Sequence, residues 1–391
     1  MPLYLKHKLK DLCTKIGSGS TPRGGDSVYK THGISLIRSQ NILDFTFSKN
    51  GLAYIDEVQA KELANVTLKE RDVLLNITGD SVARVSQVPD NILPARVNQH
   101  VAIIRANQEK LTPEYLKYCL LSKPNKELLL SLASTGATRK AITKVMIEEF
   151  EIAIPDEEGT NTQTRIAAIL SALDDKIELN RRTNETLEKI AETLFKKYFV
   201  EGIDEENLPE GWRMGKLGEI IEIFDSKRIP LSSLERETRK GIYPYYGAAS
   251  LMDYIDSYIF DGVYLLLGED GSVIDKNGFP ILQYVWGKFW VNNHAHVIKG
   301  KQHYSTDYLY ILLKNTVVNH LVTGAVQLKI NQSNLNNLEI IIPDKITCDK
   351  FSSEIDSLFS LKRNNIDENN NLENLRVSLL PKLMSGEIEV N

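Results

Sequence analysis

The chain has 391 residues, of which 42% are hydrophobic and 25% are charged, and its formal net charge at pH 7 is −5. This balance is typical of folded proteins and excludes collagen-like, low-complexity and wholly disordered chains, while the length predicts two or three domains. The charged N-terminal segment and the absence of any run of about 18 apolar residues argue against a secretion signal or a membrane span, so we predict a cytoplasmic protein.

Positive charge is concentrated in the first part of the chain. Residues 1–155 carry 21 Lys and Arg against 16 Asp and Glu, whereas the later segments all carry an acidic excess. Nucleic-acid binding requires local positive charge, so the first segment is compatible with it. An excess of this size also occurs on ordinary solvated surfaces.

The sequence contains an internal repeat. Because the stretches between the matching segments diverge, we predict two globular repeats, residues 1–155 and 203–343, that share a frame and differ inside. The matching segments are TGATRKAITKVMIEEFEIAIP from Thr135 with TGAVQLKINQSNLNNLEIIIP from Thr323, VNQH from Val97 with VNNH from Val291, and TPEYLKYCLL from Thr112 with STDYLYILLK from Ser305.

Each repeat is predicted to have an α+β fold with a mixed sheet. Short runs rich in β-branched and aromatic residues predict strands at 72–78, 100–106, 262–268, 284–291 and 338–343. Helices are predicted at 112–122, after a Thr-Pro start, and at 306–314.

A heptad pattern follows each repeat, within residues 156–202 and 344–391, and predicts two long helices. We expect them to pair antiparallel as a coiled coil, bringing Asn180 and Asn184 to Asn365 and Asn369; the alternative is that each helix packs only on its own repeat. Buried asparagines fix the register, because misalignment leaves an unpaired amide that costs ~1 to 3 kcal/mol. The predicted pairing residues are Ile166, Leu170, Leu173, Ile177, Asn180, Asn184, Leu187, Leu194, Phe351, Ile355, Leu358, Asn365, Asn369, Leu372 and Leu379.

No catalytic or metal motif stands out in the sequence. The glycine-rich stretch from Gly17 lacks the GxxxxGK[ST] pattern of a phosphate loop, and His294 and His296 share a strand face without a recognisable third metal ligand. Pro155-Asp156 with Asp174-Asp175-Lys176 resembles the PD…DxK pattern of magnesium nucleases, but these carboxylates fall on the polar face of a helix, so a solvated face is the better interpretation. The three cysteines, Cys13, Cys119 and Cys348, form no CxxC pair and are expected to be buried apolar side chains.

The remaining polar, basic and aromatic loop residues form a candidate DNA interface. Arg reads guanine, Asn and Gln read adenine, and Ser, Thr and Lys hold phosphates, although each residue taken alone is also ordinary loop surface. The candidates are Ser18, Ser20, Thr21, Arg23, Arg38, Gln40, Asn41, Arg84, Arg96, Asn98, Gln99, His100, Thr138, Arg139 and Lys140 in the first repeat, and Lys227, Arg228, Tyr243, Tyr245, Tyr246, Lys276, Lys288, Asn292, Asn293, His294, Gln327 and Lys329 in the second.

Over essentially its whole length the chain resembles the specificity (S) subunits of type I restriction-modification systems. The resemblance lies in two diverged repeats that are each followed by a long heptad helix, and in short motifs. These motifs are GSTP from Gly19, IRSQNI from Ile37, NQHVAIIR from Asn98, the two TGA segments, and LPEGW from Leu208.

The resemblance implies that each repeat is a target recognition domain reading one half of a bipartite, asymmetric DNA sequence. The helices would set the spacer and dock two methylase subunits, in a circular pseudo-two-fold arrangement in which SGEIEV at Ser385 returns toward Met1. This chain would catalyse nothing and bind no cofactor. S-adenosylmethionine, ATP and Mg²⁺ would act in the adenine-N6 methylase subunits and up to two restriction subunits. The alternative function is a protein-interaction scaffold that dimerises through its helices.

Overall fold

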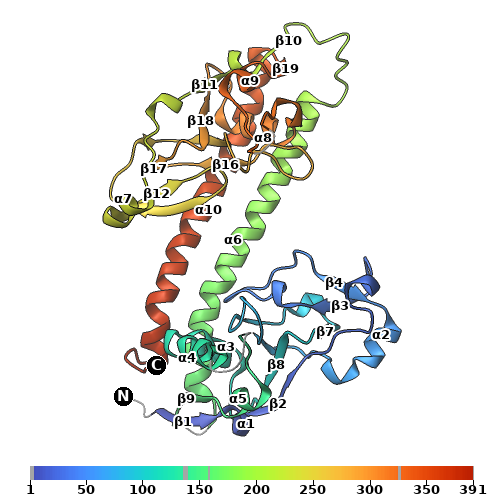
Figure 1. Ribbon diagram of the computed structural model, residues 1–391, viewed down its shortest axis with the longest axis vertical. Coiled ribbons are helices and arrows are strands. Elements are labelled where there is room, and N and C mark those ends of the chain that lie inside the picture. The colour runs from blue at the N-terminus through green and yellow to red at the C-terminus, as the bar shows by residue number, and fades with distance from the viewer. Residues whose placement is uncertain (1–3, 135–139, 157–158, 325–326, 391) are drawn as a thin grey trace. The chain divides into compact units, whose positions relative to one another are not determined.

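The computed structural model describes residues 4–134, 140–156, 159–324 and 327–390. The chain forms two compact units: unit 1 comprises Met1–Leu179 with Glu368–Asn391, and unit 2 comprises Asn180–Asp367. Two long helices, α6 (Asn161–Phe199) and α10 (Lys345–Met384), each contribute one part to each unit (Figure 1). None of the helices in the described part of the chain is long and apolar enough to cross a membrane.

Unit 1 contains three sheets. Antiparallel strands form the first, in the order β2-β8-β5-β6; the second, β4-β3-β7, is mixed because β3 runs parallel to β7; and β1 pairs with β9. The elements are β1 (Tyr4–Lys8), α1 (Leu9–Leu12), β2 (Cys13–Ser18), β3 (Ile34–Ile37), β4 (Ala53–Ile55), α2 (Glu57–Glu62), β5 (Val73–Asn76), β6 (Val85–Gln87), β7 (Ala95–Val97), β8 (Val101–Ala106), α3 (Pro113–Leu121), α4 (Lys123–Ser134), α5 (Lys144–Glu148) and β9 (Glu151–Pro155).

Unit 2 repeats this plan. Its sheets are β11-β18-β15-β16, β13-β12-β17-β14 and β10-β19, and β12 runs parallel to β17 as β3 does to β7. The elements are β10 (Arg213–Lys216), β11 (Ile221–Ile223), α7 (Ser233–Thr238), β12 (Lys240–Tyr246), β13 (Leu251–Ile255), β14 (Phe260–Asp261), β15 (Tyr264–Gly268), β16 (Leu282–Val285), β17 (Lys288–Val291), β18 (Ala295–Gly300), α8 (Thr306–Lys314), α9 (Gln332–Asn336) and β19 (Glu339–Ile342).

The shared topology confirms the internal repeat that the sequence predicts. The matching sequence segments lie on matching elements, since TPEYLKYCLL forms α3 and STDYLYILLK forms α8. Their starts use ordinary helix-start chemistry: Pro113 takes the first helical position of α3, and the Ser305 hydroxyl accepts a hydrogen bond from the Tyr308 amide at 3.0 Å in α8.

In unit 1, the first part of α6 pairs antiparallel with the last part of α10. The Asn369 side-chain amide donates to the Ile177 carbonyl at 3.2 Å, and Lys176 lies 3.0 Å from Glu368. Both helix segments also contribute to the core of the unit, where Ile166 and Leu170 belong to the same buried cluster as Leu380 and Leu383. Pairing and packing on the globular part are therefore combined rather than alternative.

In unit 2, the rest of α6 pairs antiparallel with the first part of α10. The Asn365 side chain donates to the Asn184 side-chain oxygen at 2.9 Å, and Asn184 donates to the Lys362 carbonyl at 3.3 Å. The predicted coiled-coil helices and their direction are thereby confirmed. All fifteen predicted pairing residues are buried or half-buried.

The first and last described segments of the chain lie together in unit 1. The Tyr4 hydroxyl donates to the Leu383 carbonyl at 3.2 Å, so strand β1 is tied to the C-terminal end of α10 (Figure 1). The expected return of the SGEIEV segment toward the start of the chain is seen at Gly386, where a Cβ would lie 2.7 Å from the Tyr4 ring.

Two local predictions need correction. Residues 284–291 form two strands instead of one, because Gly287 adopts a φ of 73° between β16 and β17, which then join different sheets. Cys119 and Cys348 are buried as expected, but Cys13 is only half-buried. Burial raises the pKa of all three thiols to about 12, which makes them poor nucleophiles.

Candidate nucleic-acid interface

In unit 1, several loops that contain the sequence motifs meet at one place. The Ser20 amide donates to the Val97 carbonyl at 3.0 Å, and the Asn98 amide donates to the Ile37 carbonyl at 2.9 Å. The GSTP, IRSQNI and VNQH motifs, which are far apart in the sequence, are therefore neighbours. We call residues 18–23, 38–41, 77–84, 98–100 and 140–142 loop cluster 1.

The loop after β5 also belongs to this cluster. The Ile77 amide donates to the His100 carbonyl at 3.0 Å, and the Gly79 amide donates to the Lys140 carbonyl at 3.2 Å. Lys140 directly follows the TGATR segment, whose residues 135–139, including the candidates Thr138 and Arg139, lie outside the described residues.

Unit 2 builds the same cluster with the equivalent bonds. The Asn292 amide donates to the Tyr246 carbonyl at 3.0 Å, the Glu269 amide to the His294 carbonyl at 2.8 Å, and the Gly271 amide to Leu328 at 3.0 Å. We call residues 224–228, 246–250, 268–272, 292–296 and 327–330 loop cluster 2. The backbone frame is thus repeated, whereas the side chains on it differ.

The charge of the two clusters differs. Among its described residues, loop cluster 1 has four cationic side chains, Arg23, Arg38, Arg84 and Lys140, and one carboxylate, Asp80. Loop cluster 2 balances three cationic side chains with three carboxylates within its ranges. Loop cluster 1 therefore has the stronger electrostatic attraction for a polyanion.

The predicted asparagine readers have a structural task instead. The side-chain oxygens of Asn98 and Asn292 accept the amides of His100 and His294, at 3.1 and 2.8 Å, and both asparagines are buried. Asn41 is completely buried and holds the Arg38 amide at 2.9 Å. Because buried amides that shape turns cannot face a base edge, we remove Asn41, Asn98 and Asn292 from the candidate interface.

Arg38 and Gln40 are oriented at the surface of loop cluster 1. The Arg38 guanidinium donates to the Gly51 carbonyl at 2.6 Å and lies 5.3 Å from the centre of the Tyr29 ring, and Gln40 donates to the same carbonyl at 3.1 Å. Fixed side chains of this kind lose little conformational entropy when they bind. Arg96 instead lies along β7, where it donates to the Ala60 carbonyl at 3.1 Å and burial lowers its pKa.

The remaining first-repeat candidates differ in exposure. The half-buried candidates are Ser20, Thr21, Arg38, Arg84, Arg96 and His100. The exposed candidates are Ser18, Arg23, Gln40, Gln99 and Lys140.

An ion network lies inside loop cluster 2. Arg228, a predicted DNA contact, is largely buried and donates to Glu269 at 2.7 Å and to the Ala295 carbonyl at 2.6 Å. The buried His296 ring bonds Asp225 at 2.6 Å through Nδ1 and the Ile330 carbonyl at 2.8 Å through Nε2. Arg228 therefore holds the loop together, so we remove it from the candidate interface.

Asp225, Glu269 and His296 lie close enough to one another to be considered as metal ligands. Both carboxylates already face the Arg228 guanidinium, and Lys329 lies 3.2 Å from Glu269. Burial would raise the pKa of Glu269, but the Arg228 hydrogen bond and the nearby positive charges lower it. Because these cations already balance the carboxylates, we interpret the group as an ion-pair network, not as a metal centre.

The aromatic candidates of unit 2 also divide. Tyr245 is buried, and its hydroxyl accepts the Leu231 amide at 2.9 Å, so it is removed from the candidate interface. Tyr243 lies 5.1 Å from Tyr258, centre to centre, and the Lys288 ammonium lies 4.6 Å from the Tyr258 ring centre. Tyr243 and Lys288 lie on strands β12 and β17, and Tyr258 lies in the connection between β13 and β14, so none of the three belongs to loop cluster 2. Half-buried Tyr246 and exposed Lys227, Asn293, His294, Gln327 and Lys329 belong to the cluster, whereas exposed Lys276 does not.

Two residues that were not predicted from the sequence bond the repeated histidines. The Thr78 hydroxyl lies 2.7 Å from Nδ1 of His100, and an Asp270 carboxylate oxygen lies 2.5 Å from Nδ1 of His294. Both partners follow equivalent strands, β5 and β15. Aligning the two LL-containing strands of the repeats would have paired Thr78 with Asp270, because each lies two residues beyond the end of its strand.

The nuclease-like carboxylate has a different environment from the one expected. Asp174 accepts hydrogen bonds from the Tyr118 hydroxyl at 2.6 Å and from Lys117 at 2.9 Å, and it is also bonded by Arg376. It is a largely buried ion-pair centre between α3, α6 and α10, and not part of a solvated helix face. Lys176 bonds Glu368 on the surface, so the DxK pattern is accounted for by ion pairs of the helices.

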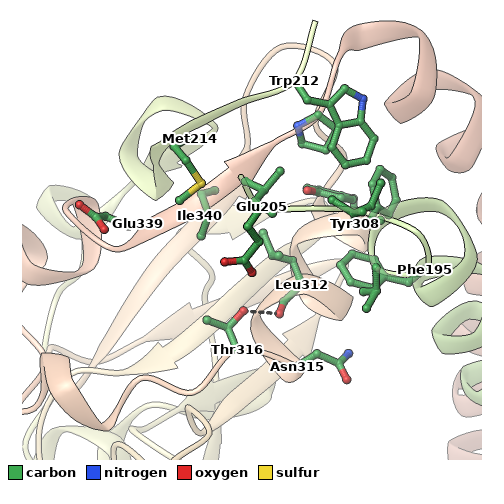
Figure 2. Close-up of a pocket in the computed structure, with 15 residues that line it drawn as sticks. Phe195, Glu205, Trp212, Met214, Tyr308, Leu312, Asn315, Thr316, Glu339 and Ile340 are labelled. Carbon is green, nitrogen blue, oxygen red and sulfur yellow. Dashed lines mark hydrogen bonds between the residues drawn. The ribbon is translucent and has the colours of Figure 1, made fainter. Parts of the chain in front are cut away.

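An apolar cavity of about 530 Å³ lies in unit 2 where the end of α6 meets α8 and β19. Figure 2 shows Phe195, Tyr308 and Trp212 around it, with the Thr316 hydroxyl bonded to the Leu312 carbonyl at 2.7 Å. None of its lining residues belongs to loop cluster 2. Its walls continue the aromatic core of the unit.

Comparison with known proteins agrees with this architecture. The family described as "Type I restriction modification DNA specificity domain" matches residues 3–189 and 209–374. The type I restriction enzyme MjaIX specificity subunit of Methanocaldococcus jannaschii is 29% identical, covering 98% of this chain and 93% of that protein. The type I restriction enzyme HindI specificity subunit of Haemophilus influenzae is 23% identical, covering 83% and 88%.

A solved structure shares the fold. The crystal structure of the type I restriction-modification system S subunit from M. genitalium superposes with a TM-score of 0.63 at 16% identity, covering 98% of this chain and 96% of that one. At this identity the likeness extends to the fold and not to individual side chains.

Proposed function

Because the chain belongs to the family of type I restriction-modification DNA specificity proteins, with two copies of the specificity domain, we propose that each unit reads one half of a bipartite, asymmetric DNA sequence. The observation that carries the proposal is the loop cluster that both units build on the same backbone bonds with different side chains. A shared frame places each set of loops in the same way, while the different side chains select different bases.

The two clusters would divide the work of binding. The exposed side chains of loop cluster 1, with Arg38 and Gln40 already oriented, supply both phosphate contacts and base contacts. Loop cluster 2 is electrically balanced, so its affinity depends more on base contacts and on neighbouring subunits.

We further propose that this chain is the non-catalytic part of a larger assembly. The α6 and α10 helices set the distance between the half-sites and dock two methylase subunits. S-adenosylmethionine would act in these subunits, which methylate adenine at N6. ATP and Mg²⁺ would act in restriction subunits where these are present. Burial and ion pairing of Asp174 support this division, because they occupy the carboxylate that the DxK pattern would need.

The test is a domain exchange read by methylome sequencing of cells that express the chain with its methylase. Replacing residues 1–155 with the corresponding segment of a relative should change one half of the methylated motif and leave the other half unchanged. A change in both halves would refute separate readers. A chain that supports no sequence-specific methylation, yet binds other proteins, would favour a protein-interaction scaffold.

A second variant tests the spacer. Insertion of four residues into both α6 and α10, about one helical turn or ~6 Å each, should lengthen the unspecified gap without altering either half-site. A changed half-site would show that the helices contribute to base recognition.

A further inference from the structure

Both loop clusters contain a histidine in the same backbone setting. The amides of His100 and His294 are held by the Asn98 and Asn292 side chains. Their carbonyls accept the amides of Ile77 and Glu269, which directly follow β5 and β15. Since most other side chains in the two clusters differ, this shared setting points to a shared task for the histidine.

The partner of the imidazole ring differs between the clusters. In unit 1, Nδ1 of His100 lies 2.7 Å from the Thr78 hydroxyl, which can either donate or accept a hydrogen bond. In unit 2, Nδ1 of His294 lies 2.5 Å from an Asp270 carboxylate oxygen. An ionised carboxylate can only accept, so Asp270 keeps the proton on Nδ1 and fixes the plane of the ring.

The other ring nitrogen, Nε2, is the polar atom left for a ligand. In His100 it lies 3.4 Å from the Gln99 side-chain nitrogen, whereas in His294 no bond to Nε2 is found within the described parts of the chain. The His294 side chain is 46% exposed, and Asp270 is 19% exposed. Asp270 therefore holds Nδ1, and the His294 side chain is partly open to solvent.

We propose that His294 contacts a base edge through Nε2 and that Asp270 is the positioning residue that aims it, with Thr78 aiming His100 in the same way. The assignment rests on the proposed function, because it presumes that loop cluster 2 faces DNA. It deepens that function by naming one reader in each half and the residue behind it. Exchange of the partner at position 78 or 270 would be a route by which such loops alter their specificity.

The ligand is a major-groove base edge. In the neutral tautomer that donates from Nδ1 to Asp270, Nε2 is an acceptor, which suits the exocyclic amine of adenine or cytosine. Loss of a phosphate contact would instead weaken binding to all sequences alike and lower the salt slope by about one. Salt titration therefore separates a base contact from a phosphate contact.

The experiment uses the full chain assembled with its methylase subunits. The wild-type motif is first obtained by methylome sequencing, and methylation rates are then measured on duplexes that carry each single base change. The variants are His294→Ala, Asp270→Leu and Asp270→Asn, with His320→Ala as the control, because His320 is an exposed histidine of the same unit outside loop cluster 2.

We expect His294→Ala and Asp270→Leu each to slow methylation of the cognate site roughly 10-fold or more and to relax one position in the half-site of unit 2. Their effects should not multiply in the double variant, because Asp270 acts through His294. Asp270→Asn should retain most of the selectivity, since the amide oxygen can still accept from Nδ1. His100→Ala should relax the other half-site.

Three outcomes would overturn the inference. The variants could leave the motif unchanged, or slow all sequences equally with a changed salt slope, or lower the melting temperature and the overall rate without relaxing any position. The last would show that the pair only supports the fold. If the wild-type chain itself gives no bipartite motif, the proposed function fails instead, and the two failures are thus distinguishable.

Discussion

Replacement of Asp174 by alanine should strongly destabilise unit 1. The carboxylate is only 13% exposed and is bonded by Lys117 and Arg376, whose side chains are 8% and 10% exposed. Its removal leaves two cations close together and out of water, and breaking a buried pair in this way costs about 3 to 5 kcal/mol. For a unit of this size, each kcal/mol shifts the melting temperature by about 2 to 4 °C, so the expected loss is about 6 to 20 °C.

The assay is thermal unfolding of Asp174→Ala beside two neighbours. Asp175 is exposed, so Asp175→Ala should stay within about 0.5 kcal/mol of the wild type. Lys176→Ala breaks a surface pair with Glu368 whose partners are both more than two-fifths exposed, and it should cost less than about 1 kcal/mol.

Replacement of the whole network separates charge from packing. Asp174→Leu combined with Lys117→Met and Arg376→Met should recover much of the stability, because no charge then remains buried. Arg376 also packs on Phe45, with the guanidinium carbon 3.8 Å from the ring centre, a contact that methionine can partly replace. If Asp174→Ala melts like Asp175→Ala, the ion-pair argument is wrong. If it folds normally but the assembly loses DNA cleavage, the nuclease interpretation returns.

Two further predictions concern the helices in unit 2. Asn184→Leu with Asn365→Leu removes both members of a bonded pair, so it should raise the melting temperature while allowing misaligned or intermolecular pairing of the helices. Light scattering after size exclusion would detect such pairing. A lower melting temperature and an unchanged monomer would contradict this prediction. Burial would raise the pKa of Glu188, but Lys362 and Lys314 lower it below 4.5. The stabilisation from this carboxylate is therefore present above that pH and is lost as the pH falls further. Glu188→Gln should flatten this loss of stability in acid in melting experiments, and an equally steep loss would assign the effect to other groups.

Local periodicity explains why the helices and the repeat could be predicted. The heptad segments 156–202 and 344–391 include the whole of α6 and α10. Such helices can be predicted because the residues of a helix-pairing surface are three and four positions apart in the sequence. The repeat was visible where matching side chains serve the shared frame, as in the VNxH turn, whose asparagine is buried in both units.

Strand partners could not be predicted in the same way. The run at 284–291 has uniform strand composition, but the bend at Gly287 sends β16 to β15 and β17 to β12, and these partners are distant in the sequence. The choice between one strand and two therefore depends on nonlocal contacts that composition does not contain.

The candidate interface was predicted at the level of loops and not of side chains. Residue type says that Arg228 can bind phosphate, but only the fold shows that Glu269 occupies it, and Tyr245 is likewise committed to Leu231. Thr78 and Asp270 were missed because neither residue type is distinctive, and their importance arises from the rings that they touch.

Gly19 offers a direct test of whether the loops of cluster 1 must meet. A Cβ at this position would lie 2.2 Å from the Asn98 carbonyl oxygen and 2.3 Å from that of Val97, both of them backbone atoms. The same backbone is fixed by the bond from the Ser20 amide to the Val97 carbonyl, so it cannot retreat without opening the cluster. At Gly17, in contrast, a Cβ would meet nothing within 4 Å.

Gly19→Ala should therefore cost about 1 to 3 kcal/mol in unit 1, as overpacking does, and should weaken methylation through the first half-site. Gly17→Ala, two residues away on β2, is the matched control and should behave like the wild type in both melting and methylation. Equal behaviour of the two variants would mean that the GSTP and VNQH loops do not need to touch. A stable Gly19→Ala that has lost only the first half-site would show that this contact serves recognition more than folding.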